Sequence, residues 1–329
     1  MKKRILSLFN YFNAATGRKT IRLASGHVLC HRLPPALSGG VDFGAGHFYA
    51  GSVLLNIVLV HGAFHGGWCW SEVAAELSRR GARVHTPTLT GLADRQHLFS
   101  PSVNLATHVK DIVNLIEYEK LDDCVLVGHS YAGNVLSGVG DQLRERVGHY
   151  IFVDASVPVN GSTHWGWAHL NPESTPDMME LLNTEGRGMM IPPFPAAAFG
   201  ITDPAQAKAL EAQLTPMPRG CFTDAIELKN CGTEGLRRSY IAATNPPYAR
   251  MARTVAWVSA DPQWTFREID SAHDMMILKP LETAEIIWAL ADGGQRTEDR
   301  GQRTEVVGCE FGTVVWIGRL TWCGTLEYL

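Results

Sequence analysis

One stretch of ten residues, Cys124–Gly133, constrains the fold of this chain more than any other. The four apolar residues Cys124–Val127 predict a buried strand, and a helix-compatible stretch follows Ser130. A strand that turns sharply into a helix holds the serine at its apex in strained backbone geometry and lifts its hydroxyl clear of the sheet. Small residues must flank such a turn, and Gly128 and Ala132 meet that need. The stretch therefore predicts a serine presented for chemistry at a strand-to-helix turn.

The rest of the chain alternates between apolar strands and helical patterns. Strands are predicted at 56–62, 83–87, 124–127, 149–154, 239–244 and 265–269. Helices are predicted at 70–80, 105–121, from the serine turn to about 147, at 248–255 and at 281–291. Continuous apolar strands that alternate with helices are typical of a parallel sheet covered on both faces. We therefore expect an α/β fold built on a mostly parallel, doubly wound sheet.

Bulk composition excludes several classes of protein. The chain has 329 residues, 45% hydrophobic and 19% charged, as expected of an ordinary globular protein. A net charge of −4 gives no basic surface for nucleic acid. The seven cysteines form no CxxC pair, which argues against a zinc site, and no apolar run reaches the roughly 18 residues of a membrane span.

Three segments depart from the alternation and define the expected domains. The main domain is expected to cover 54–291. Within it, residues 157–236 are rich in Pro, Met and aromatic residues, which predicts a helical lid. Some side chains of this lid are expected to line an apolar pocket. Residues 1–53 predict a poorly ordered N-terminal extension, and 292–329 a C-terminal appendage with a short seven-residue repeat. The extreme N-terminus imitates a signal peptide, but asparagines interrupt its apolar core, so we expect a cytoplasmic protein, with secretion as the alternative.

A serine hydroxyl becomes a nucleophile only beside a base, which is usually oriented by a carboxylate. On a strand-turn-helix serine, these groups follow in the order Ser, acid, His. His273 lies in the loop after the last strand and is the expected base for Ser130. The identity of the acid stays open, because no carboxylate follows strand 239–244. Asp154, at the end of strand 149–154, is favoured, and Asp261 is the alternative.

Acyl transfer also requires two backbone N–H groups aimed at the developing oxyanion. Tyr131, directly after the serine, is expected to provide one, and Ala63 in the glycine-rich loop 61–67 the other. Neither a cofactor nor a metal ion is needed for this chemistry. Four other histidines are expected to have supporting roles. His129 is expected to be structural and His61 to order the glycine-rich loop. His65 is expected to lie at the mouth of the pocket, and His108 to be exposed or hydrogen-bonded locally.

Five stretches of the sequence together match a known family pattern: Val58–Trp68, Thr90–Arg95, Gly128–Gly133, Val153–Pro158 and His273–Met276. On these residues the sequence resembles the α/β-hydrolase superfamily. More narrowly, it is similar to the small-ester esterase group that also contains plant methyl-ester esterases and hydroxynitrile lyases. The resemblance covers about 54–291 and implies hydrolysis of a small to medium carboxylic ester through an acyl-enzyme, without a cofactor.

Two departures from the family pattern bear on function. The usual aspartate after the lid is absent, as noted above. Hydroxynitrile lyases of this group carry Thr where this chain has Gly62, together with a Lys near the acid that this chain lacks, so the esterase interpretation is favoured. The alternatives are a hydroxynitrile lyase or acyl transferase on the same residues, or a ligand-binding member without catalysis.

Overall fold

A computed structural model gives the fold and describes residues 9–13, 18–22, 28–30, 55–164 and 180–292. The chain forms two units, Met1–Ser52 and Val53–Leu329. In the first unit, β1 (Phe9–Asn13), β2 (Arg18–Arg22) and β3 (Val28–Cys30) form an antiparallel sheet. The poor order expected of residues 1–53 stays a prediction, and the C-terminal appendage from 293 on lies outside the described residues.

The second unit is built on a six-stranded sheet in the order β11-β10-β7-β6-β4-β5, and every pair in it is parallel. The strands are β4 (Asn56–Val60), β5 (Arg83–His85), β6 (Cys124–His129), β7 (Val147–Val153), β10 (Arg238–Ala243) and β11 (Trp264–Ile269). The central strands are buried along nearly their whole length, since helices cover both faces. The parallel, doubly wound sheet predicted from the sequence is confirmed.

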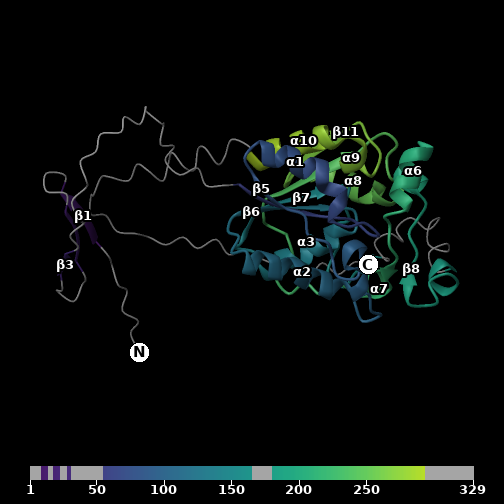
Figure 1. The fold of residues 1–329 in the computed structure, drawn as a ribbon, viewed down its shortest axis with the longest axis horizontal. Helices are drawn as coiled ribbons and strands as arrows, with labels where there is room; N and C mark the ends of the chain where they lie inside the picture. Colours follow the sequence, from purple (N-terminus) through teal and green to yellow (C-terminus); the bar gives the residue numbers. More distant parts are fainter. Residues whose placement is uncertain (1–8, 14–17, 23–27, 31–54, 165–179, 293–329) are drawn as a thin grey trace, which may run out of the picture. The chain divides into compact units, whose positions relative to one another are not determined.

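Helices pack on both faces of this sheet (Figure 1). They are α1 (Ser71–Arg79), α2 (Leu105–Tyr118), α3 (Ala132–Gln142), α8 (Ala252–Ala260), α9 (Met275–Leu278) and α10 (Pro280–Asp292). The apolar sides of α1, α9 and α10 share one hydrophobic core with the sheet, and those of α2, α3 and α8 share the other. Among the helices of the described residues, none has both the length and the apolar character needed to cross a bilayer.

Local sequence explains where these helices begin. Asn104 caps α2: its side chain accepts the N–H of Thr107, and the Thr107 hydroxyl faces the Asn104 N–H in return. Helix α8 begins at Ala252 rather than at Tyr248 as predicted, because the 3-10 turn η5 (Ala249–Met251) precedes it. Such one-turn shifts at helix ends are usual and leave the core unchanged.

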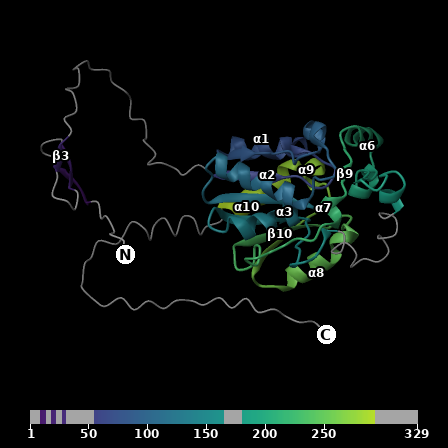
Figure 2. The same cartoon turned by 90° about the horizontal axis from the view of Figure 1, so that it is seen from below.

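The chain between β7 and β10 contains the segment 157–236 for which the sequence predicts a helical lid, and the lid stays a prediction. Its described elements are β8 (Met190–Ile191), η4 (Ala196–Phe199), α6 (Pro204–Glu211), β9 (Met217–Pro218) and α7 (Gly220–Thr223), with β8 and β9 paired antiparallel. They gather at one end of the sheet in two perpendicular views (Figures 1 and 2). Residues 165–179 of the insertion lie outside the described part of the chain.

Candidate active site

Ser130 stands at the turn between β6 and α3, as the sequence predicts. Its φ is +54°, in the left-handed region that non-glycine residues rarely adopt. Its N–H donates to the carbonyl of Val153 at 3.1 Å, and its own carbonyl accepts the N–H groups of Gly133 and Ser156, each at 3.1 Å. The neighbouring strand β7 and the loop after it therefore hold the serine in this strained geometry.

The turn leaves no room for a side chain at Gly133. A Cβ at this position would lie 1.8 Å from the carbonyl oxygen of Ser156, which is backbone and cannot move aside. At Gly128 a Cβ would instead meet the tip of Leu136 at 2.4 Å, and a side-chain tip can rotate away. The close approach of two backbone segments thus explains the small residues around the serine.

We therefore expect Gly133→Ala to destabilise the protein by about 3 kcal/mol or more, at the upper end of the usual cost of overpacking a core. Thermal unfolding followed by circular dichroism measures the effect. Gly128→Ala is the matched control and should shift Tm less, because only a leucine tip must move. Equal shifts in the two variants would show that the contact with Ser156 does not limit the turn.

The structure brings Ser130, His273 and Asp154 together from three separate segments. The Ser130 hydroxyl lies 2.9 Å from Nε2 of His273 and is placed to donate to it, while Nδ1–H of His273 donates to Oδ2 of Asp154 at 2.6 Å. Asp154 directly follows β7 and has a φ of +41°, and its N–H donates to the carbonyl of Ile241 at 2.7 Å. His273 and Asp154 are both buried, so water does not compete for the bond between them.

Asp261, the alternative acid, lies elsewhere. It ends α8, and its carboxylate accepts the N–H of Gln263 at 2.9 Å, just before β11 begins at Trp264. His273 follows the opposite end of that strand, which at about 3.3 Å per residue is roughly 20 Å long. Asp261 is therefore at the amino end of the sheet, away from His273.

The loop after β4 approaches the serine from the other side. A Cβ at Gly62 would lie 3.1 Å from the Ser130 Cβ and 2.8 Å from Nδ1 of His129, so only glycine lets this backbone come so close. Among the described residues, no acceptor takes the N–H of Ala63 or that of Tyr131. The oxyanion hole expected from these two N–H groups stays a prediction, and it requires donors that no protein acceptor occupies.

Two buried histidines anchor the segments that carry these donors. His61 accepts the N–H of Leu89 at Nε2 (3.0 Å), so its Nδ1–H donates to the carbonyl of Gly62 at 2.8 Å, and burial lowers its pKa to about 3. His108, expected to be exposed or bonded locally, is buried and bonded. Its ring lies between the Tyr131 hydroxyl (3.1 Å) and the Thr90 carbonyl (3.0 Å).

His129 does more than shape the turn. Its ring centroid lies 4.5 Å from that of His273, and its Nε2–H donates to the His273 carbonyl at 3.0 Å. Burial first, and then the neighbouring His273, hold the pKa of His129 well below its ordinary value. This neutral ring therefore supports the loop that carries His273.

His65 has a buried partner, Asp274, that is distant from it in the sequence. Nε2 of His65 lies 3.1 Å from Oδ2 of Asp274, and both side chains are almost fully buried. Burial disfavours the charged form of both groups. The charge and the hydrogen bond of the partner outweigh this penalty, so the pKa of Asp274 is lowered and that of His65 is raised. Asp274 follows His273 directly in the chain, so the pair lies next to the candidate base.

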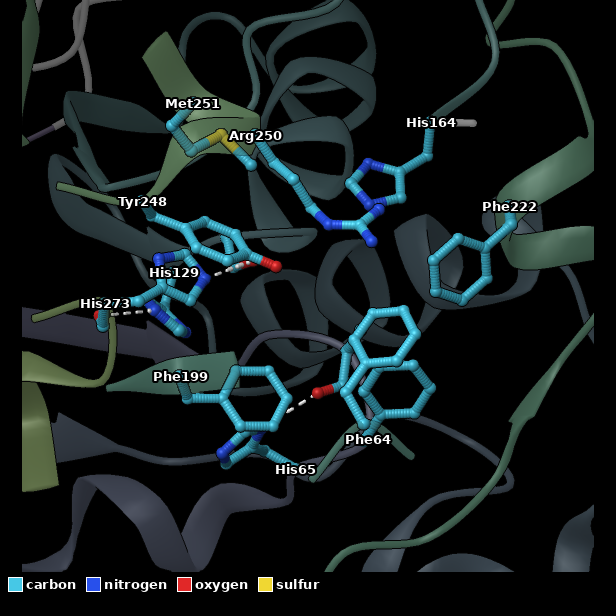
Figure 3. Close-up of a pocket in the computed structure, with 13 residues that line it drawn as sticks. Phe64, His65, His129, His164, Phe199, Phe222, Tyr248, Arg250, Met251 and His273 are labelled. Atoms are coloured by element: carbon cyan, nitrogen blue, oxygen red, sulfur yellow. Dashed lines mark hydrogen bonds between the residues drawn. The ribbon is translucent and has the colours of Figure 1, made fainter. Parts of the chain in front are cut away.

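A pocket opens above these groups and is lined largely by aromatic rings (Figure 3). It holds about 470 Å³ of empty space, part of it open to solvent. Phe64 comes from the loop after β4, and Phe194, Phe199 and Phe222 come from the insertion. Tyr248 stacks on the His273 ring with a centroid separation of 3.8 Å. Phe194, Phe199 and Phe222 are thus aromatic side chains of the segment 157–236 that line the pocket.

Among the described residues, one group of side chains has its potential metal-ligating atoms within 4.8 Å of one another. It consists of His129, His273 and Asp274. Both ring nitrogens of His273 are already occupied by Ser130 and Asp154, and Nε2 of His129 donates to a carbonyl. These residues do not fit a metal ion, because too few lone pairs remain to coordinate one.

The model of the "Alpha/beta hydrolase family" matches residues 57–286. A carbendazim hydrolyzing esterase of Nocardioides sp. strain SG-4G is 34% identical over 254 residues, which cover 72% of this chain and 100% of that protein. Putative methylesterase 15 of Arabidopsis thaliana is 24% identical over 211 residues, covering 60% of this chain and 48% of that protein.

Among solved structures, an extracellular α/β-hydrolase from a Paenibacillus species superposes with a TM-score of 0.64 at 25% identity. The match covers 72% of this chain and 98% of that one. That protein is described as sharing structural and functional homology with tobacco salicylic acid binding protein 2.

Proposed function

The chain belongs to the alpha/beta hydrolase family and is a carboxylic ester hydrolase, and on this basis we propose that it cleaves its ester through an acyl-enzyme formed on Ser130. The observation that carries the proposal is the continuous hydrogen-bond chain from Ser130 through His273 to Asp154. Such a chain activates a serine hydroxyl that would otherwise be a poor nucleophile at neutral pH.

In the acylation step, Oγ of Ser130 attacks the ester carbonyl carbon while Nε2 of His273 takes the hydroxyl proton. The Asp154 carboxylate accepts Nδ1–H and stabilises the imidazolium that forms. The carbonyl oxygen becomes an oxyanion, held by the N–H groups of Ala63 and Tyr131. His273 then gives its proton to the leaving alcohol, and the acyl group remains on Ser130.

Deacylation repeats the sequence with water as the nucleophile. His273 takes a proton from water as the water oxygen attacks the acyl carbonyl. The second tetrahedral intermediate then collapses: the bond to Oγ of Ser130 breaks, His273 returns the proton to Oγ, and the acid is released. The same two N–H groups serve both intermediates, so no further donor is needed.

The pocket supports a substrate with a small to medium apolar group. Aromatic and other apolar side chains make up most of its lining, as is usual for sites that bind small molecules. Phe64 and Phe222 lie with ring centroids 5.9 Å apart and nearly parallel, and Phe194 meets Phe64 edge-on at 5.1 Å. A flat aromatic group gains from such surroundings through stacking as well as burial.

The experiment that tests the proposal is covalent labelling of the purified full chain with a fluorophosphonate. We expect one phosphonyl group per molecule by intact mass, located on Ser130 by peptide mapping, with loss of hydrolysis of 4-nitrophenyl acetate and 4-nitrophenyl benzoate. The aromatic benzoate should show the lower KM, because its ring fills the pocket. Carbendazim, for which the Nocardioides relative is named, completes the panel of substrates.

Attachment of the phosphonyl group to another serine, or none at all in a folded protein, would contradict the proposed nucleophile. Transfer of the acyl group to an added alcohol in preference to water would point instead to an acyl transferase on the same residues. Release of an aldehyde and cyanide from a cyanohydrin, with no ester hydrolysis, would point to a lyase.

A further inference from the structure

The hydrogen bonds of His65 determine its charge. Nδ1 lies 2.8 Å from the carbonyl oxygen of Ala63, which can only accept, and Nε2 lies 3.1 Å from Oδ2 of Asp274. An ionised carboxylate can also only accept, so both ring nitrogens must carry protons for both bonds to form. A doubly protonated imidazole is a cation, and the buried carboxylate beside it supplies the compensating charge.

We propose that His65 is a permanent imidazolium paired with Asp274, and that this pair is a positioning device that fixes the oxyanion loop to the loop carrying His273. The inference deepens the proposed function and rests on it. Neither residue touches the reacting atoms in this scheme. His65 acts on the Ala63 peptide, and Asp274 acts from the position next to His273 in the chain.

Three titratable groups near the pair are uncharged, namely His61, His129 and Cys69. His61 is neutral because its Nε2 accepts the N–H of Leu89. Nδ1 of His129 has no hydrogen-bond partner among the described residues, and its Nε2 lies 3.8 Å from Oδ1 of Asp274. Burial raises the pKa of the Cys69 thiol well above its usual value, so that it stays protonated. Burial raises the pKa of the Tyr248 hydroxyl, a further neighbour of Asp274, to about 12, and His273 is bonded to Ser130 and Asp154.

Packing favours a charged His65 as well. The indole of Trp68 stacks on the imidazole with a centroid separation of 5.5 Å and an interplanar angle of 29°. The negative face of an indole attracts a cation placed over it. Phe199 meets the same imidazole edge-on at 5.4 Å, so the ring cannot rotate away from Asp274 without losing both contacts.

The geometry links the pair to transition-state stabilisation. By donating to the Ala63 carbonyl, His65 restrains the backbone of the residue whose N–H is proposed to hold the oxyanion. Its positive charge, two residues from that donor, also favours negative charge on the substrate oxygen. Both effects stabilise a negative charge that is present in the transition state and not in the bound ester, so their loss should lower kcat and leave KM nearly unchanged.

Asp274→Asn separates the charge from the hydrogen bonds. The asparagine amide can donate to Nε2 of a neutral His65, whose Nδ1–H still donates to Ala63, so both bonds survive and only the charges disappear. We expect kcat for 4-nitrophenyl acetate to fall about tenfold, the range associated with hydrogen bonds to charged groups, with KM changed less than about twofold. Asp270→Asn, at an exposed position in the same loop, is the matched control and should change neither constant.

The decisive readout is the protonation of His65, followed by NMR of the full chain labelled with ¹⁵N-histidine and assigned with His65→Gln. In the unmutated protein both ring nitrogens should stay protonated at pH 8, well above the ordinary histidine pKa of about 6.5. In Asp274→Asn, Nε2 should lose its proton. A singly protonated His65 in the unmutated protein at pH 7, or an Asp274→Asn variant with unchanged kcat, would overturn the inference.

The two proposals fail in different ways. An unlabelled Ser130 in a folded, inactive protein would overturn the proposed function, while the NMR measurement on the unmutated chain would still report the charge of His65. If Asp274→Asn does not fold, that same titration still decides the charge, and a proton lost near pH 6.5 would refute the pair.

Discussion

Replacement of Ser130 by alanine is expected to lower kcat for ester hydrolysis by about 10⁵-fold or more, to near the rate supported by binding and the oxyanion donors alone. The hydroxyl is the proposed nucleophile, and the neighbouring serines lie in other settings: Ser137 donates to a carbonyl in its own helix, and Ser156 is bonded to Asn134. A stopped assay of the purified protein on 4-nitrophenyl acetate measures the loss.

The fold should survive this substitution, because alanine is smaller than serine. The φ of +54° at this position strains an alanine about as much as it strains a serine. Ser137→Ala is the control, a buried serine seven residues further along α3, and should retain kcat within about twofold. Matching circular dichroism spectra and Tm values would separate lost chemistry from lost structure. Ester hydrolysis that persists in Ser130→Ala would refute the nucleophile assignment.

The sheet could be predicted from the sequence because its signal is local. Asn56–Val60 and Cys124–His129 are short, continuous apolar strands, and burial between two helical layers is what such composition requires. Ser130 and His273 could be predicted for a related reason. Each follows the end of a strand, and the carboxyl ends of parallel strands meet at one edge of the sheet.

The acid could not be assigned in the same way, since two aspartates follow helices or strands at plausible points in the chain. What separates them is which end of the sheet each occupies. Asp154 follows the carboxyl end of β7, whereas Asp261 precedes β11. That distinction depends on strand order and direction, which only the three-dimensional fold provides.

The pair formed by His65 and Asp274 was beyond sequence reasoning altogether. The two residues are 209 positions apart, and nothing in the local pattern of either one indicates the other. Similarly, His108 lies on a helix and gave no sign that the Tyr131 hydroxyl would reach it. Long-range polar contacts in a core follow from packing, so they become visible only once the core is known.

Asp154→Asn is expected to lower kcat by about 10⁴-fold while leaving the fold intact, the second-largest effect among these substitutions. The carboxylate accepts Nδ1–H of His273 at 2.6 Å and thereby fixes the tautomer in which Nε2 can take the Ser130 proton. An amide can present its NH₂ group to Nδ1 instead, which places the imidazole proton on Nε2, where it cannot act as a base. It also carries no charge to stabilise the imidazolium.

Asparagine suits this position in every other respect, because it tolerates the left-handed φ of +41° better than most residues. Asp261→Asn is the matched control: its amide oxygen can still accept the Gln263 N–H, and kcat should stay within about twofold. Steady-state kinetics of the three proteins on 4-nitrophenyl acetate make the comparison. If Asp154→Asn lowers kcat no more than Asp261→Asn does, Asp154 is not the acid, and the 2.6 Å contact serves only to hold the loop of His273 in place.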